Sequence, residues 1–360
     1  MTIVHEFIEI EAEALPFPEE ARDSISERAH DSLEILLKRS EMIDASQEPR
    51  KLMRSISGFL DRQGFFYRDS TLLCESLVSG TAACRQYSVI YLAIAEHLEE
   101  VNKVKIPLAA VLAPDHVFVR YTGKNERFNW ETTSGEMKCD DWYRRFFKIH
   151  KDSIKNRVYL NDLSRTEVKA LAHCGAGFAN ADLGNIKTAY HHFSKALELL
   201  PRLAEAFNAR GDARHKLKDL SGAIQDYGSA ICLNPHFSLA YFNKGRALHA
   251  LQAHSNALLQ LNAAISLDPN FGEAYFQRAM VHHELGNINN ETYDLFRSAM
   301  PGTRYESPLR ESPSGSSFQE GNPDIAGSQR IYRPGEGRSW HKGDGAGKHD
   351  PDIPEEDKIH

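Results

Sequence analysis

The chain has 360 residues, which is long enough for two domains with separate hydrophobic cores. Its composition is 41% hydrophobic and 26% charged, as in an ordinary soluble protein. The net charge of -7 argues against a nucleic-acid-binding protein, because such proteins usually carry a basic surplus. We therefore expect no nucleic-acid partner.

Cysteine usage and the N-terminal segment both indicate a reducing compartment. The five cysteines are odd in number, far apart and without CxxC spacing, which fits free thiols better than disulfides. The first 20 residues are rich in glutamate and lack the basic start and apolar run of a signal peptide. No window approaches the ~18 apolar residues that a membrane span requires. These features predict a cytoplasmic protein with no membrane partner.

Three helices are predicted near the N-terminus. Over residues 19–39, apolar side chains recur every four positions, as in an amphipathic helix: Ile25, Ala29, Leu33 and Leu37. Met53, Ile56 and Leu60 predict a second helix. Residues 84–98 predict a third, with one face formed by Cys84, Ser88, Tyr91, Ala95 and Leu98.

Three strands are predicted next, over residues 106–112, 116–121 and 127–131. Helices followed by a short antiparallel sheet indicate an α+β domain, which we assign to residues 1–160. Within that range, residues 141–161 are expected to form a basic connecting segment into the next domain.

The start of the third helix contains a candidate nucleophile. If Thr81 caps this helix, Cys84 lies in the first turn, near unpaired N–H groups and the positive end of the helix dipole. That environment favours the thiolate, which is the reactive form of cysteine. Taken alone, Cys84 is more typical of a small buried hydrophobic residue, because free cysteines are commonly buried.

A histidine and a glutamate are predicted to meet across the sheet. If residues 122–125 form the hairpin loop, Tyr121 pairs with Glu126, and the same register places His116 opposite Glu131. Directly opposed residues share a face, with Cβ atoms roughly 5 Å apart. A carboxylate there could orient the imidazole and stabilise its charged form, whereas a shift of one residue would separate the two. Without this context, His116 would be a structural histidine and Glu131 a surface charge.

Residues from about 70 to 135 resemble the transglutaminase-like, papain-fold superfamily. The resemblance is greatest to the bacterial, SirB-like branch, in which this domain precedes tetratricopeptide repeats; the matching stretches are 80–92, 114–120 and 129–135. By position, it implies Cys84 as nucleophile, His116 as base and Glu131 as acidic partner. Many members have Asp followed by Pro at the third place, whereas Glu131 is followed by Thr132. Some members of this branch lack the cysteine, which leaves a non-catalytic domain as the alternative.

The activity implied by the resemblance is acyl transfer, as in an amidase, a protease or a transglutaminase. The Cys84 thiolate would attack an amide or ester carbonyl, and His116 would protonate the leaving amine. This chemistry requires no metal or organic cofactor, so none is predicted.

Five residue positions recur with a period of 34 in the C-terminal half. One position is proline, at 201, 235 and 269. The other four hold Gly177, Gly211 and Gly245; Ala189, Ala223 and Ala257; Phe193, Tyr227 and Leu261; and Ala196, Ala230 and Ala264. The pattern resembles the tetratricopeptide repeat, a helical hairpin in which a small residue admits an aromatic ring. We predict an all-α solenoid of about 3.5 repeats over residues 161–300, with an irregular last repeat as its cap.

The groove of such a solenoid is expected to hold a protein or peptide partner. Its candidate lining residues are Asn208, Asp212, His215, Phe242, Arg246 and His249. Some tetratricopeptide domains bind chaperone C-termini through a lysine, asparagine and arginine clamp, but the equivalent places here hold Cys174, Phe178, Asn208, Leu239 and Asn243. An EEVD-type tail is therefore not the expected ligand.

Two pairs of adjacent histidines are candidate metal ligands. The side chains of His191-His192 and of His282-His283 point about 100° apart on a helix and rarely chelate together. No metal site is predicted.

The last segment, residues 301–360, holds nine of the 23 glycines and seven of the 15 prolines, which predicts a disordered tail. The sequence thus predicts a Cys-His-Glu acyl-transfer domain joined to a protein-binding solenoid. The alternative is a non-catalytic adaptor or scaffold with the same two domains.

Overall fold

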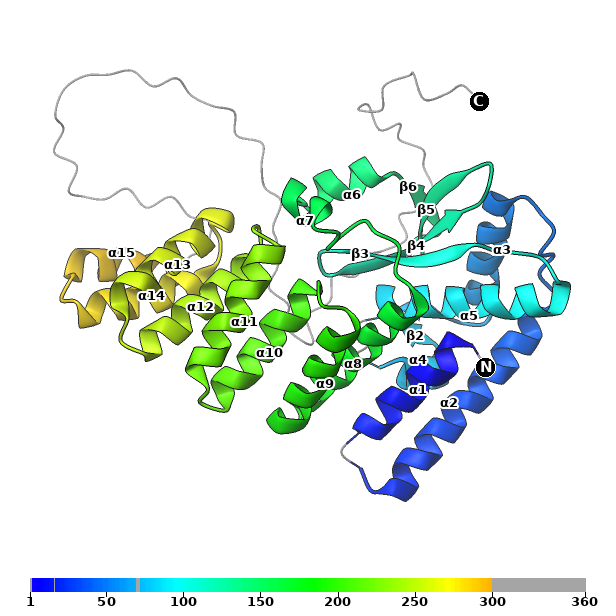
Figure 1. Cartoon of the computed structure of the whole chain (residues 1–360), viewed down its shortest axis with the longest axis horizontal. Helices are drawn as coiled ribbons and strands as arrows, with labels where there is room; N and C mark the ends of the chain where they lie inside the picture. Colours follow the sequence, from blue (N-terminus) through cyan, green and yellow to red (C-terminus); the bar gives the residue numbers. More distant parts are fainter. Residues whose placement is uncertain (1, 16, 69–71, 300–360) are drawn as a thin grey trace, which may run out of the picture.

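The structure is a computed structural model that describes residues 2–15, 17–68 and 72–299. An N-terminal unit of helices and small sheets continues into a row of paired helices (Figure 1). The predicted tail over residues 301–360 lies outside the described residues. Among the described residues, no helix has both the length and the apolar character needed to cross a lipid bilayer.

Five helices form the first part of the N-terminal unit: α1 Ile3–Ala14, α2 Glu19–Ser40, α3 Pro49–Arg62, α4 Leu73–Ser79 and α5 Cys84–Asn102. The three predicted helices are confirmed as α2, α3 and α5, whereas α1 and α4 were not predicted. In α2 the predicted stripe is largely buried, with Ala29, Leu33 and Leu37 facing the core.

Helix α5 is the central helix of this unit. Every residue from Gln86 to Ala95 is buried, so the helix has no solvent-facing side over that stretch, and the predicted single buried face is too narrow. It packs against the strands β3 Leu108–Ala113 and β4 His116–Thr122 as well as against α1 and α2. Ser88 Oγ also donates a hydrogen bond to the carbonyl of Val117 at 3.1 Å, which ties the helix to the sheet.

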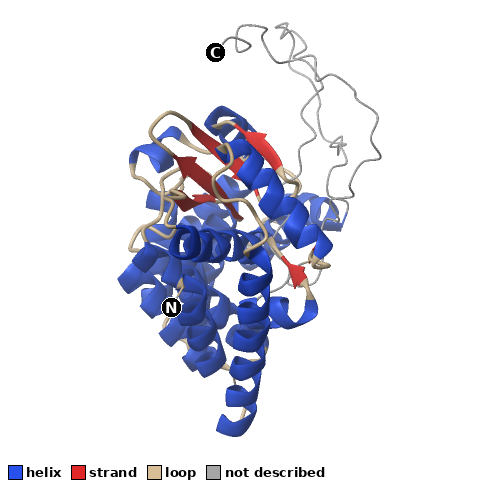
Figure 2. Cartoon of the chain, turned by 90° about the vertical axis from the view of Figure 1, so that its right-hand side faces the viewer, coloured by secondary structure: helices blue, strands red, loops and turns tan. Residues whose placement is uncertain are grey.

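The main sheet is antiparallel and has the order β3-β4-β5-β6, formed by Leu108–Ala113, His116–Thr122, Arg127–Glu131 and Glu136–Lys138. The first three strands confirm the prediction, whereas the three-residue β6 was not predicted. A separate parallel pair consists of β1 Phe66–Tyr67 and β2 Thr81–Ala82. Figure 2 shows most of the strands near the top of the view, above the greater part of the helices.

The predicted register between β4 and β5 is wrong by two residues. Tyr121 lies opposite Phe128 rather than Glu126, and the strands close at the pair Thr122 and Arg127, so residues 123–126 form the loop. Because the side-chain period of a strand is two, a two-residue slip leaves every residue on its predicted face. His116 and Glu131 therefore share a face without being directly opposed.

The segment over residues 141–161 is more than the basic connection predicted. It forms α6 Asp140–Phe146 and α7 Lys151–Lys155 and then runs beside β3, where the Leu160 N–H donates to the Leu112 carbonyl at 2.9 Å. The buried guanidinium of Arg120 binds the Leu160 carbonyl at 3.0 Å and the Asp140 carboxylate at 2.5 Å. These contacts make the segment part of the N-terminal unit.

Four helical hairpins form the solenoid: α8 Arg165–Asp182 with α9 Ile186–Leu199, α10 Ala204–Lys216 with α11 Leu220–Leu233, α12 Ser238–Ala250 with α13 His254–Leu267, and α14 Gly272–Glu284 with α15 Ile288–Ala299. The recurring glycines lie where the two helices of a hairpin meet. A Cβ at Gly211 would come within 2.7 Å of the Tyr227 ring, and one at Gly177 within 2.6 Å of the Phe193 ring.

The N-terminal unit and the first repeat share one hydrophobic core. A continuous cluster of buried residues runs from Ile3 in α1 to Ala206 in α10. Helix α1 packs on α8, and the Asn180 side chain donates to the Ala14 carbonyl at 2.7 Å. The predicted domain boundary at residue 160 therefore lies within a core that the N-terminal unit and the first repeat share.

Candidate functional site

Cys84 is the first residue of α5. The residue that caps the helix is Ala83, in extended conformation, and not Thr81 as predicted. Thr81 instead lies in β2 opposite Phe66, and its hydroxyl is 2.7 Å from that of Ser79. Cys84 nevertheless lies at the N-terminus of a 19-residue helix, where backbone N–H groups have no intrahelical acceptor and the helix dipole is positive.

His116 is held at the start of β4 by a tight turn. Ala113 pairs with His116 across a two-residue connection made of Pro114 and Asp115. Asp115 has φ of 52°, the left-handed conformation that Asp tolerates better than most residues. The next residue, Val117, accepts a hydrogen bond from Ser88 of α5 through its carbonyl, which ties the start of β4 to that helix.

Glu131 holds the imidazole of His116 in place. Its Oε2 lies 2.7 Å from His116 Nε2, and the side chains of both residues are largely buried. The Thr133 hydroxyl donates to Glu131 Oε1 at 2.9 Å, and the Tyr143 hydroxyl donates to Oε2 at 3.1 Å. The His116 ring also stacks on Phe147, with ring centroids 5.4 Å apart. The imidazole is therefore fixed by one carboxylate and by aromatic packing.

Cys84 and His116 interact as a coupled pair. Burial disfavours the thiolate of Cys84, but the positive charge of His116 and a hydrogen bond from its ring outweigh burial and lower the pKa of the thiol. Burial likewise disfavours the imidazolium, but the Cys84 thiolate and then the Glu131 carboxylate raise the pKa of His116. Since Nε2 faces Glu131, Nδ1 is the ring nitrogen available to Cys84. The pair thus favours thiolate and imidazolium together.

The environment of Glu131 keeps it ionised. Burial raises the pKa of its carboxyl, but hydrogen bonds from His116 and from Thr133 outweigh burial, so the pKa lies below its ordinary value. Tyr143 and Phe147, which complete the site, belong to a segment that the sequence predicted only as a connection. The aromatic residues at 142, 143, 146 and 147 were the one signal there of a packed segment.

The other thiols have different environments. Cys74 and Cys174 are buried, and burial raises the pKa of both, to about 12 for Cys174. Cys139 and Cys232 are exposed, and Cys84 is half-buried. Cys84 thus differs from the two buried thiols in its lowered pKa and its hydrogen bond with a histidine.

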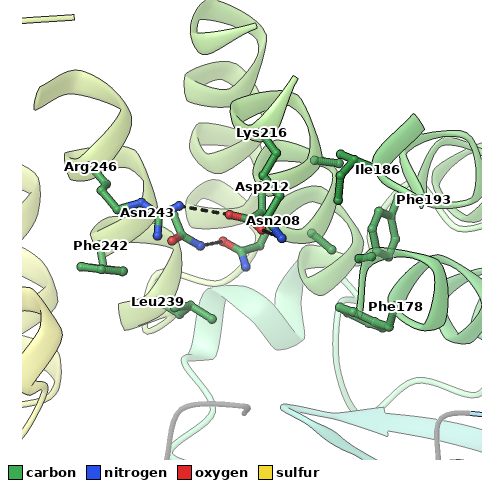
Figure 3. A pocket seen from close by; sticks show the side chains of 13 residues that line it. Phe178, Ile186, Phe193, Asn208, Asp212, Lys216, Leu239, Phe242, Asn243 and Arg246 are labelled. Atoms are coloured by element: carbon green, nitrogen blue, oxygen red, sulfur yellow. Dashed lines mark hydrogen bonds and ion pairs between the residues drawn. The ribbon is translucent and has the colours of Figure 1, made fainter. Parts of the chain in front are cut away.

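The solenoid holds a pocket of about 250 Å³ lined by residues of α8, α9, α10 and α12 (Figure 3). Four of the six predicted groove residues line it, namely Asn208, Asp212, Phe242 and Arg246, whereas His215 and His249 do not. Its polar residues bond to one another: Asn243 donates to the Asn208 side chain at 3.1 Å, and Arg246 to Asp212 at 3.2 Å. Phe178, Phe193 and Leu239 make the rest of the wall mainly apolar.

The hairpin of α12 and α13 matches a known repeat. Residues 239–271 match the tetratricopeptide repeat. The two preceding hairpins carry the same pattern at the same 34-residue spacing, and α14 with α15 forms an irregular last repeat in which Glu291 replaces the recurring alanine, so the predicted tetratricopeptide solenoid is confirmed. No curated protein matches the chain.

Several solved tetratricopeptide structures are similar to part of the chain. MamA is 22% identical, with a TM-score of 0.35, over 36% of this chain and 76% of MamA. The first repeat domain of Spaghetti (RPAP3), solved with the HSP90 peptide SRMEEVD, is 26% identical, with a TM-score of 0.32, over 32% of this chain and 93% of that domain. YrrB, described as having an unusual peptide-binding site, is 21% identical, with a TM-score of 0.33, over 41% of this chain and 77% of YrrB.

Proposed function

We propose that the N-terminal unit catalyses cysteine-dependent acyl transfer and that the tetratricopeptide repeats hold its protein substrate or partner. The observation that carries the proposal is the 2.7 Å contact between Glu131 and His116, combined with the lowered pKa of the Cys84 thiol beside that histidine. A nucleophile, a base and a residue that orients the base are the three parts that covalent acyl transfer needs.

In the acylation step, the Cys84 thiolate attacks the carbonyl carbon of an amide or ester, and a carbon–sulfur bond forms. The N-terminus of α5, including the Cys84 N–H, lies where it can stabilise the developing oxyanion. The tetrahedral intermediate collapses as the bond to the leaving group breaks, and the His116 imidazolium gives its proton to that group. A thioester on Cys84 and a neutral His116 remain.

In the second step, neutral His116 takes a proton from water or from an amine, which attacks the thioester carbonyl. The carbon–sulfur bond breaks, and the thiolate and imidazolium are restored. Glu131 stabilises the imidazolium of the resting enzyme and keeps Nδ1 directed toward the sulfur. Water as acceptor gives hydrolysis, whereas an amine gives transfer or crosslinking.

The resemblance to the transglutaminase-like, SirB-like proteins supports the same assignment. It gives the three residues these roles by position, with Glu131 followed by Thr132 in place of the commoner Asp-Pro. The free cysteines fit the cytoplasm, where thiols stay reduced, and we propose that location.

A non-catalytic adaptor is the second candidate. It is favoured by the continuous core between α1 and the first repeat, because that packing suits a rigid scaffold that needs no chemistry. In that case the Cys84, His116 and Glu131 contacts would only stabilise the fold.

Alkylation of the intact protein near neutral pH separates the two candidates. An active site makes Cys84 react much faster than Cys74 or the exposed Cys139, and His116→Ala slows Cys84 alone. Peptide mapping by mass spectrometry reports each rate. Equal, slow labelling of all three thiols would support the adaptor.

A further inference from the structure

Two imidazoles and one carboxylate meet at the junction of the third and fourth repeats. His249 lies near the end of α12, His254 begins α13 and Glu284 ends α14. One ligand atom from each lies within 4.8 Å of the other two. Nε2 of His249 is 3.1 Å from Glu284 Oε1, and Nδ1 of His254 is 3.6 Å from Glu284 Oε2.

The ring of His254 carries a nitrogen that the described residues do not satisfy. Its Nδ1 is buried and has no hydrogen-bond partner among them, although it faces the Glu284 carboxylate. A buried nitrogen without a partner loses its hydration without compensation. A cation between Nδ1 and the carboxylate would satisfy both groups.

The ring of His249 is oriented by a neighbour. Gln277 from α14 places an amide nitrogen 2.6 Å from His249 Nδ1. Amide nitrogen and oxygen exchange by a half-turn of the amide, which would let the oxygen accept from Nδ1–H and leave the Nε2 lone pair free. Histidines that bind metals usually donate their other nitrogen to such a partner.

We propose that His249, His254 and Glu284 bind a divalent metal ion of the zinc class. Zinc bonds to His and Glu of ~2.0–2.2 Å imply ligand atoms about 3.3–3.6 Å apart in a tetrahedron. His249 is 3.1 Å from Oε1 of Glu284 and His254 is 3.6 Å from Oε2, and one ligand atom of each residue lies within 4.8 Å of the other two, so small side-chain shifts would give that spacing. Three protein ligands leave the fourth position to water.

The metal would join three helices, α12, α13 and α14, which also pack through a shared apolar cluster that includes Phe242, Leu261 and Val281. Its effect is therefore to hold the last hairpin against the rest of the solenoid. The histidine pairs His191-His192 and His282-His283 contribute none of the three ligands. Each ligand comes from a different helix.

Calorimetric titration of the metal-free full chain with Zn²⁺ tests the proposal, and the absorption of bound Co²⁺ reports the ligand geometry. All samples carry Cys84→Ala, so that the thiol beside His116 cannot hold the metal. We expect one site, a rise in Tm on adding Zn²⁺, and at least a tenfold loss of affinity in His254→Ala and in Glu284→Gln. Gln277→Ala should weaken binding by about 10–100-fold.

His283→Ala is the matched control, since His283 adjoins Glu284 in sequence but its ring faces Glu291 at 3.0 Å. It should bind as the parent does. Circular dichroism checks that each variant folds, and Glu284→Gln is conservative at an exposed position. Absence of Zn²⁺ binding by the parent, or equal binding by the parent, His254→Ala and Glu284→Gln, would overturn the proposal.

Discussion

Glu131 reaches His116 diagonally across the sheet, with Oε2 2.7 Å from Nε2, although the two residues are not opposite each other in the register. The register of β4 and β5, continued beyond their paired residues, sets His116 across from position 133. Diagonal neighbours in a sheet are separated by about 7–8 Å, so a long side chain is needed to close the gap. The extra methylene of glutamate, compared with aspartate, therefore matters at this position.

The reactivity of Cys84 should depend on both the charge and the length of residue 131. Glu131→Gln removes the charge that stabilises the His116 imidazolium, and we expect Cys84 alkylation near neutral pH to slow by about 10–100-fold. Glu131→Asp keeps the charge but shortens the reach, and should be slowed as well. Tyr143→Phe removes only one weaker hydrogen bond to the carboxylate and serves as the control. Full reactivity in Glu131→Gln would show that the carboxylate has no part in activating the thiol.

The repeats should respond oppositely to the same substitution at two glycines. In Gly211→Ala the new Cβ meets the Tyr227 ring at 2.7 Å, and overpacking of this kind costs about 1–3 kcal/mol. In Gly228→Ala the nearest atom is the Lys244 Nζ at 3.7 Å, so alanine should stabilise α11 by about 0.5–1 kcal/mol. Urea unfolding measures both. A stabilising Gly211→Ala would contradict the packing of this hairpin.

A buried carboxyl should make stability depend on pH. Glu11 accepts the N–H groups of Leu73 and Cys74 at the start of α4, at 2.5 and 3.2 Å, and its burial raises its pKa to about 8. The folded state then binds more protons than the unfolded state between about pH 4.5 and 8, so the free energy of unfolding falls as pH rises through that interval.

Glu11→Gln removes this titration but keeps an oxygen acceptor for α4. Relative to the parent, the variant should gain about 1–4 kcal/mol as pH rises from 5 to 8, measured by urea unfolding. Glu13→Gln, at an exposed position of the same helix, is the control and should follow the parent. Parallel curves for Glu11→Gln and the parent would show that Glu11 does not titrate in this range.

The groove should reject peptides with an acidic C-terminus. Leu239 and Asn243 occupy clamp positions, so the cations that hold such peptides are missing there. The two cations that do line the groove, Lys216 and Arg246, are both paired with Asp212. We expect no saturable binding of a peptide ending in EEVD by calorimetry, and binding to appear in the double variant Leu239→Lys, Asn243→Arg. Tight binding of the same peptide by the parent would contradict this view of the groove.

Periodic features were predictable from the sequence, and short or aperiodic ones were not. Helix α2 has an apolar residue every fourth position, and the repeats recur every 34 residues, so both could be recognised. Helix α4 has seven residues and β6 has three, which is too short for a period to show. Helix α1 lies in the glutamate-rich start of the chain, for which no helix was predicted, and Glu11 within it is buried.

The part of the candidate site that could be predicted depends on the two-residue side-chain period of a strand. The shared face of His116 and Glu131 follows from that period and survived an incorrect register, because the error was an even number of residues. The contributions of Tyr143 and Phe147 depend on how α6 folds back onto the sheet, for which no local pattern exists. The meeting of His249 and Glu284 depends on the stacking of adjacent repeats, in which positions about 34 residues apart become neighbours.

The central claim is that the Cys84 thiolate is stabilised by the His116 imidazolium. The most direct test is the ultraviolet absorbance of the thiolate as a function of pH, taken as the difference between the parent and Cys84→Ala. We expect the thiolate to persist below the ordinary pKa of a cysteine thiol, and His116→Ala to move the midpoint of its titration to higher pH. A midpoint at or above the ordinary value in the parent, unchanged in His116→Ala, would contradict it.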